Sequence, residues 1–259
     1  MVQPLIAKAS SDIIYPDSDG QLMADNTKQF RWIVVIKENL ELLFANQPDV
    51  FVAGDLLWYP IEGNNTTRQA PDTMVVFGRP KGDRGSYKQW KEDNIPPQVV
   101  FEILSPGNRL AAMAKKLQFY RRWGVEEYYV YDPDDNELIG WARSNGDLEV
   151  IDEMAGWVSP RLQIRFEPTS DMLKIYRPDG EPFLTFTELA QLREQERQRA
   201  EQERQRAEQE RQRAEQERQR AEQERQRAEE ALTQLEIERR RNEALANRLR
   251  ELGVNLEDI

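Results

Sequence analysis

An acidic residue inside an apolar strand is the feature of this chain that most constrains its fold. The segment Val99–Leu104 has the length and the apolar composition of a strand that is buried on both faces, yet Glu102 lies within it. A buried carboxylate that lacks a partner costs folding free energy or takes up a proton. The sequence therefore predicts that a metal ion, a lysine or a dense set of hydrogen bonds lies beside Glu102.

The segment that follows supplies a candidate partner for this acid. Apolar residues recur there at three- and four-residue spacing, which predicts a helix packed on the sheet. The residues that define its apolar face are Leu110, Met113, Leu117 and Tyr120. Lys116 lies at the edge of this face, whereas Lys115 points away. A strand, a crossover helix and a parallel strand wind right-handed, which brings the helix back over the sheet, so we expect Lys116 to reach Glu102.

A second acid precedes another predicted strand. Pro71 and Asp72 come directly before the apolar, β-branched segment 73–77, so Asp72 is expected at the mouth of a sheet strand. Two carboxylates can hold a divalent cation while a lysine orients or activates water, which suits hydrolysis of a phosphodiester. Two structural alternatives stay open. Asp72 caps a turn, or Glu102 and Lys116 form a buried ion pair without a catalytic role.

The ordered motifs resemble those of a known family. They are Pro71-Asp72, Glu102-Ile-Leu-Ser-Pro106, Lys116-Leu-x-x-Tyr120 and Gly124-Val-x-Glu-Tyr-Tyr129. Over roughly residues 12 to 186 the chain is similar to the Uma-two family of bacterial endonuclease-like proteins, which belongs to the PD-(D/E)XK superfamily. The resemblance implies a restriction-endonuclease-like fold that uses Mg or Mn. It also implies metal ligation by Asp72, Glu102 and the backbone carbonyl of Ile103, and a catalytic role for Asp72, Glu102 and Lys116.

Two positions depart from the family pattern. The superfamily expects a lysine two residues after the second acid, where this chain has Leu104, so the resemblance places the catalytic lysine on the helix at Lys116. Family members often carry an acid one helical turn before that lysine, and this chain has Ala112 there. A second metal contact is then missing, which keeps open the alternative of a catalytically weakened protein that binds nucleic acid.

The composition excludes several chemistries. The chain has no cysteine and no histidine, so disulfides, zinc sites of the Cys/His type and mechanisms with a catalytic histidine are excluded. The groups that remain for catalysis are carboxylate, lysine and tyrosine side chains and a bound metal ion. No apolar run approaches the roughly 18 residues of a membrane span, and the N-terminus lacks the apolar core of a signal peptide. We expect a cytoplasmic protein that makes no membrane contact.

The charge balance bears on DNA as a partner. With 47 acidic and 36 basic residues the net charge is −11, which argues against strong nonspecific DNA binding. Locally, residues 78–91 combine basic side chains with Tyr87 and Trp90, which suits contact with nucleic acid beside a metal site. The basic residues are Arg79, Lys81, Arg84, Lys88 and Lys91. The alternative is an ordinary solvated loop.

The order of predicted elements indicates an α/β fold with a mixed sheet flanked by helices. A first helix from about 27 to 44 is capped by Asn26 or Thr27, and by the same resemblance it offers Glu38 or Glu41 as a candidate metal ligand. Strands are expected at 51–59, 73–77, 98–104 and 127–131, and a hairpin at 138–142 and 147–151 turns at 144–146. We divide the chain into a flexible N-terminus (1–11), a nuclease-like domain (12–186) and a heptad-repeat helix (187–259).

The last part of the chain repeats Glu-Gln-Glu-Arg-Gln-Arg-Ala every seven residues, which predicts a long charged helix or a coiled coil. Alanine at position a and glutamate at position d form a poor contact surface, or seam, for a second helix. We therefore expect pairs of Arg and Glu within the helix, rather than a partner helix, to stabilise most of it. The last heptads place Leu235, Leu245, Leu249 and Leu252 in the seam, with Asn242 at an a position. We expect a weak, concentration-dependent homodimer; a solvated single helix is the alternative.

These features favour a metal-dependent endonuclease that hydrolyses DNA phosphodiester bonds with Mg or Mn and carries a C-terminal oligomerising helix. Its expected partners are DNA and a second copy of the chain. Two alternatives remain, namely a catalytically weakened nucleic-acid-binding protein and a structural assembly protein built on the coiled coil.

Overall fold

A computed structural model describes residues 13–18, 20, 24–107 and 110–251 of this chain. The chain divides into two compact units, Met1–Leu189 and Ala190–Ile259. The segment 1–11, expected to be flexible, lies outside the described residues.

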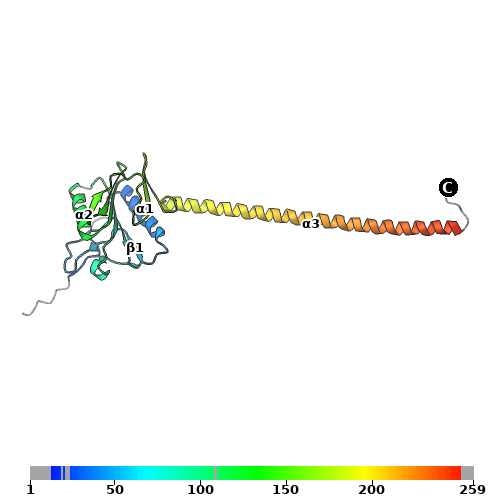
Figure 1. Cartoon of the computed structure of the whole chain (residues 1–259), viewed down its shortest axis with the longest axis horizontal. Coiled ribbons are helices and arrows are strands. Elements are labelled where there is room, and N and C mark those ends of the chain that lie inside the picture. Colours follow the sequence, from blue (N-terminus) through cyan, green and yellow to red (C-terminus); the bar gives the residue numbers. More distant parts are fainter. Residues whose placement is uncertain (1–12, 19, 21–23, 108–109, 252–259) are drawn as a thin grey trace, which may run out of the picture. The chain divides into compact units, whose positions relative to one another are not determined.

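The first unit is a mixed α/β fold (Figure 1). The elements of the chain are α1 (Thr27–Leu43), β1 (Val50–Ala53), β2 (Trp58–Tyr59), β3 (Thr73–Phe77), β4 (Tyr87–Lys88), the 3-10 helix η1 (Gln89–Lys91), β5 (Val99–Ile103), α2 (Leu110–Trp123), β6 (Glu127–Asp132), β7 (Glu137–Ser144), β8 (Asp147–Val150), β9 (Arg165–Pro168), β10 (Leu173–Tyr176) and α3 (Phe186–Glu251). Six strands form the central sheet in the order β1-β3-β5-β6-β7-β8. Only β5 and β6 run parallel within it. The predicted α/β fold with a mixed sheet and flanking helices is confirmed.

Helices α1 and α2 cover opposite faces of the central sheet (Figure 1). Ile36 and Leu40 of α1 pack in one core cluster with Phe101 of β5, whereas Tyr120 of α2 packs in the second cluster with Val100 of the same strand. Neighbouring residues of a strand point to opposite faces, so β5 serves both clusters. Each fully buried aliphatic side chain contributes roughly 1.5–3 kcal/mol. The alternation along β5 thus decides which helix meets each functional side chain.

Local sequence signals account for several element boundaries. Asn26 caps α1, because its side-chain oxygen accepts hydrogen bonds from the backbone N–H groups of Lys28 and Gln29 at 2.9 and 2.8 Å. The predicted hairpin is confirmed as β7 and β8, and its turn at Asn145 and Gly146 has positive φ angles of 50° and 88°.

The prediction of one continuous strand at 51–59 was wrong. β1 ends at Ala53, and Asp55 adopts the left-handed conformation with φ of 48°. Trp58 and Tyr59 form the separate strand β2, which pairs in parallel with β4 at Tyr87 and Lys88. Gly54 and Asp55 interrupt the extended chain here, which an apolar strand pattern alone does not reveal.

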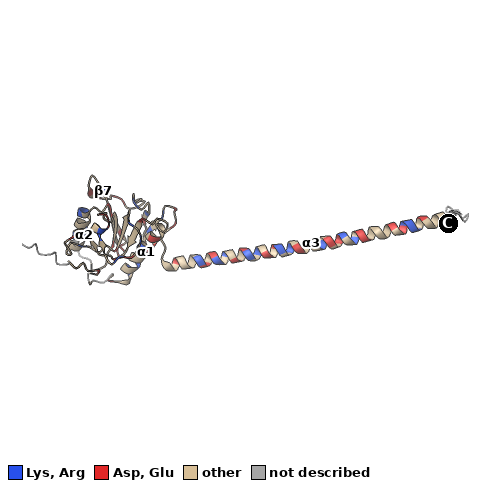
Figure 2. Ribbon diagram, turned by 90° about the horizontal axis from the view of Figure 1, so that it is seen from below, with Lys and Arg blue, Asp and Glu red and all other residues tan. Residues whose placement is uncertain are grey.

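Helix α3 is 66 residues long, and acidic and basic residues are interspersed along it (Figure 2). A capping box starts it: the Thr185 backbone N–H donates to Glu188 Oε2 at 2.8 Å, and the Glu188 N–H donates back to the Thr185 hydroxyl at 3.2 Å. Side-chain pairs such as Arg197 with Glu194 and Gln198 with Glu194 continue along it. Of the seam leucines, Leu235 and Leu245 are 63% and 55% exposed. The side chain of Leu249 and all of Leu252 lie outside the described residues.

No helix in the part of the chain that the structure describes combines the length and the apolar content needed to cross a membrane.

Candidate functional site

The pairing of β3 with β5 brings the two predicted acids together. Thr73 lies opposite Phe101 in this antiparallel ladder, so the next pair outward is Asp72 and Glu102. Val100, two residues before Glu102 on the same strand, packs in the core cluster of α2. Both carboxylates therefore belong to the face of the sheet that α2 covers.

Two residues of α2, one helical turn apart, contact Glu102. Lys116 Nζ donates to Glu102 Oε2 at 2.6 Å, and the Tyr120 hydroxyl donates to Glu102 Oε1 at 2.6 Å. The side chain of Glu102 is 2% exposed and that of Lys116 is 20% exposed. The expected contact between Lys116 and Glu102 is thus present, and by itself it fits both a catalytic pair and a structural ion pair.

Asp72 is held by the backbone of the neighbouring strand. Its Oδ2 accepts a hydrogen bond from the Ile103 N–H at 2.6 Å, so this contact joins two strands rather than closing a turn. Burial raises the pKa of Asp72 well above its usual range, and the charge of Glu102 raises it further, against the lowering effects of Lys116 and the Ile103 N–H. A cation beside Asp72 would favour its ionised form.

Lys116 is a charged donor in this arrangement. Burial alone would lower its pKa, but the charges of Glu102 and Asp72 and the hydrogen bond to Glu102 outweigh burial, so the pKa of Lys116 is raised. An ammonium group that keeps its proton at neutral pH can orient a water molecule or a phosphate oxygen by donating a hydrogen bond.

The start of α1 fastens the end of β5. Gln29 Nε2 donates to the Ile103 carbonyl at 2.8 Å, and the Ser105 hydroxyl donates to Asp25 Oδ2 at 2.5 Å. The Ile103 carbonyl, predicted as a metal ligand, accepts this hydrogen bond from Gln29, and a carbonyl oxygen has two lone pairs. Sequence reasoning missed Gln29, because nothing in a helical pattern shows which strand end a buried amide will meet.

Asp55 is a third acid near the pair that the sequence analysis also missed. Its backbone N–H donates to the Pro71 carbonyl at 3.1 Å, which places it beside Asp72. After burial and the charge of Glu102, the charge of Asp55 adds to the raised pKa of Asp72. Among the described residues, however, no three acids lie close enough together to hold one metal ion. The sequence signal that could have revealed Asp55 was Gly54, because this glycine interrupts the apolar run.

The other candidate acids do not join the pair. Glu38 and Glu41 form ion pairs with Lys37 at 3.0 and 2.6 Å, on the helix that covers the opposite face of the sheet. Ala112 is exposed on α2, one turn before Lys116, and supplies no side-chain donor.

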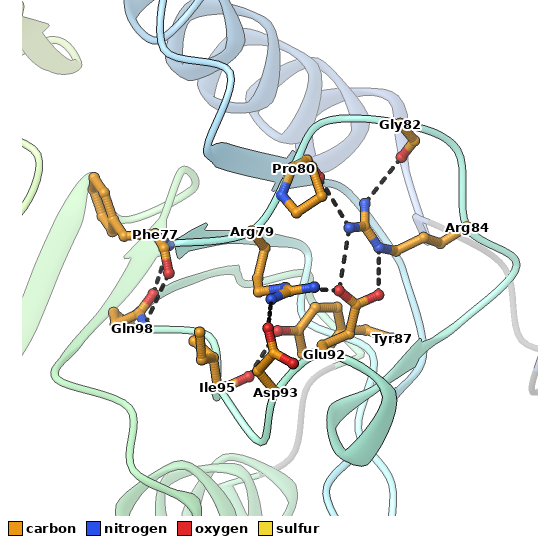
Figure 3. A network of polar contacts seen from close by, with 10 residues as sticks. All are labelled: Phe77, Arg79, Pro80, Gly82, Arg84, Tyr87, Glu92, Asp93, Ile95 and Gln98. Atoms are coloured by element: carbon orange, nitrogen blue, oxygen red, sulfur yellow. Dashed lines mark hydrogen bonds and ion pairs between the residues drawn. The ribbon is translucent and has the colours of Figure 1, made fainter.

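The basic segment between the two acidic motifs is largely organised by Glu92 (Figure 3). Arg79 Nε and Arg84 Nε contact its two carboxylate oxygens at 2.9 and 2.7 Å, and Arg79 also pairs with Asp93. The side chains of both arginines are at most 15% exposed. Burial would raise the pKa of Glu92, but the hydrogen bonds from both arginines outweigh it and lower this pKa.

These contacts change which residues of the segment are available to a partner. Arg84 also donates to the carbonyls of Gly82 and Pro80, so its donors serve the loop itself. Lys91 is exposed, Lys81 is half-buried, and Lys88 Nζ lies 5.4 Å from the ring centroid of Tyr15. The ion pairs with Glu92 thus engage Arg79 and Arg84 and do not involve the three lysines.

The chemistry of the acid pair suits a hard divalent cation. Asp72 and Glu102 are both buried, and the charge of Glu102 disfavours the ionised form of Asp72, an effect that a nearby cation would offset. Mg²⁺ is commonly held by one or two carboxylates, with water completing its shell. The donor set therefore fits Mg or Mn without a third acid.

A mixed sheet that carries two acids on adjacent strands and a lysine on the crossover helix is the arrangement that the resemblance to the Uma-two family predicted. Residues 8–162, more than half of the chain, match the family model Uma2, described as "putative restriction endonuclease". The chain belongs to the Uma2 family.

One similar solved structure is that of a "putative nuclease belonging to DUF820" from Anabaena variabilis ATCC 29413. It is 17% identical, the match covers 52% of this chain and 72% of that chain, and the TM-score is 0.40. No curated protein matches.

Proposed function

We propose that this protein is a metal-dependent endonuclease that hydrolyses DNA phosphodiester bonds with Mg or Mn. The observation that carries the proposal is the buried pair of Asp72 and Glu102 on adjacent strands, with Lys116 bound to Glu102 at 2.6 Å. Membership of a family described as "putative restriction endonuclease" supports the same class of reaction and substrate.

Each residue of the proposed site has a distinct task. Asp72 and Glu102 hold the cation, and the Ile103 carbonyl offers a further oxygen. Lys116, which carries a positive charge at neutral pH, donates a hydrogen bond to the attacking water or to a phosphate oxygen. A bound Mg²⁺ or Mn²⁺ supplies polarisation of the scissile phosphate.

We infer that Lys81, Lys88 and Lys91 contact the DNA backbone. They remain available when Arg79 and Arg84 are engaged with Glu92. A few phosphate contacts are consistent with a chain whose net charge is −11, because a few local lysines can position the protein on DNA without a large excess of basic residues.

We further propose that the chain forms a weak homodimer through the last part of α3. Leu235 and Leu245 expose apolar surface at positions a and d of one heptad register, whereas the preceding heptads place alanine and glutamate there. A second copy is the partner that this register fits.

Substitution of the paired acids tests the proposed activity. Asp72→Asn and Glu102→Gln should each lower Mg²⁺- or Mn²⁺-dependent cleavage of plasmid DNA by more than about 100-fold, because each removes a carboxylate ligand. Lys115→Met, which alters an exposed lysine of the same helix, is the matched control and should retain the wild-type rate. Cleavage that persists unchanged in both acid variants would refute the assignment.

A catalytically weakened nucleic-acid-binding protein is the second candidate, and Ala112 favours it. If the missing acid limits the site, Ala112→Glu should raise Mn²⁺ affinity or the cleavage rate, since position 112 lies one helical turn before Lys116. Equal affinity and rate would show that position 112 does not approach the cation.

A further inference from the structure

The side chain of Tyr120 is enclosed by other aromatic rings. It is 0% exposed, its ring lies parallel to that of Trp58 at a centroid distance of 6.4 Å, and the ring of Tyr128 is 4.9 Å away. Phe119 meets it edge-on at 5.8 Å. Close packing on several sides restricts a side chain to one rotamer. The Tyr120 hydroxyl is therefore fixed at the point where it donates to Glu102 Oε1.

The two donors to Glu102 differ in how firmly they are held and in charge. Lys116 reaches Glu102 Oε2 with a flexible, partly exposed side chain. Tyr120 reaches Oε1 with a rigid and neutral group. A divalent cation beside Glu102 repels the Lys116 ammonium but exerts no such net repulsion on the hydroxyl. Of these two donors, Tyr120 is the one that keeps its place when a cation arrives.

We propose that Tyr120 is a positioning residue for the metal site. Its hydroxyl holds Glu102 Oε1, so that Oε2 is presented to the cation and Lys116 is released toward water or phosphate. This inference rests on the proposed function, because it assigns Tyr120 a task toward the same cation. Partners that orient a metal ligand in this way typically change metal affinity or activity by about 10–100-fold when they are removed.

The same aromatic cluster contains a matched control. Tyr128 is 1% exposed and its ring contacts that of Tyr120, yet its hydroxyl has no hydrogen-bond partner among the residues that the structure describes. Tyr120→Phe and Tyr128→Phe each remove one buried hydroxyl and leave a ring of the same shape. Only the first removes a hydrogen bond to Glu102.

Titration of Mn²⁺ into the full-length wild type and both variants by calorimetry tests the inference. Near-UV circular dichroism gives the folded fraction of each protein, and affinity is expressed per folded molecule. We expect Tyr120→Phe to weaken Mn²⁺ binding by about tenfold or more, and Tyr128→Phe to leave it unchanged. At saturating Mn²⁺ the Tyr120→Phe variant should recover most of its DNA-cleavage rate, which a loss of folded structure would not allow.

The outcomes separate this inference from the proposed function. Wild-type protein that binds Mn²⁺ through Asp72 and Glu102, together with a Tyr120→Phe variant of equal affinity, would overturn the role of Tyr120 alone. Equal losses in the two tyrosine variants would also overturn it, because they would trace the effect to packing. Wild-type protein that binds no Mn²⁺ would overturn the proposed function, and the inference with it.

Discussion

Replacement of Lys116 by methionine should destabilise the metal-free protein strongly. The methionine side chain keeps most of the apolar stem of the lysine but removes the ammonium group, so Glu102 loses one of its two hydrogen-bond donors and its only ion-pair contact within 4.0 Å among the described residues. Because Glu102 is 2% exposed, water does not replace the lost partner.

The size of the loss follows from the burial of the pair. Removing one member of a buried ion pair costs about 3–5 kcal/mol, because a buried charge is left without a partner. We expect a loss of about 3–4 kcal/mol at neutral pH, since partial exposure of Lys116 keeps the value below the upper limit.

Urea unfolding at neutral pH with a chelator present measures this loss. Lys115→Met, on the exposed side of the same helix, is the control and should change stability by no more than about 0.5 kcal/mol. The double variant Glu102→Gln/Lys116→Met should recover at least half of the loss, because the side chain at position 102 then carries no charge. A loss below about 1 kcal/mol would refute the view that Lys116 neutralises a buried carboxylate.

Further predictions concern the cation, the basic segment and assembly. Because the raised pKa of Asp72 makes a proton compete with the cation for this carboxylate, Mn²⁺ affinity should rise with pH, and proton release should appear as a buffer-dependent heat in calorimetry. Arg84→Met should destabilise the fold by about 1–3 kcal/mol through its lost bonds to Glu92, yet leave the salt dependence of DNA binding unchanged. Lys91→Ala should leave stability unchanged and lower the salt slope by about 1. Deletion of residues 231–259 should abolish concentration-dependent dimerisation in sedimentation without altering cleavage per active site; a wild-type chain that sediments as a monomer at tens of micromolar would contradict the predicted dimer.

The sequence revealed the parts of the site that depend on periodicity within one element. The apolar run around Glu102 predicted a buried strand, and helical spacing placed Lys116 at the edge of the packed face, where it meets Glu102. Asp72 was located for the same reason, because the strand that follows it is strongly apolar. These assignments depend only on neighbours along the chain.

Other parts of the site depend on contacts between distant segments, which one sequence does not specify. The arginines of the basic segment were assigned to nucleic acid from composition, but their ion pairs with Glu92 depend on how the loop folds back. Asp55 was hidden inside a predicted strand, because a single left-handed residue ends β1. Tyr120 was interpreted as a core aromatic, and its ring is buried as expected, but its hydroxyl is bonded to the acid.

The way α3 is stabilised makes its length adjustable. The helix begins at a capping box and continues through pairs between side chains three or four residues apart, so each repeat of seven residues is stabilised almost entirely by itself and its neighbours. Loss or gain of one repeat would change the helix length by about 10 Å while rotating the end by only about 20°. A change in the number of repeats would thus lengthen or shorten α3, while the leucines near its end would point in almost the same direction around the helix axis.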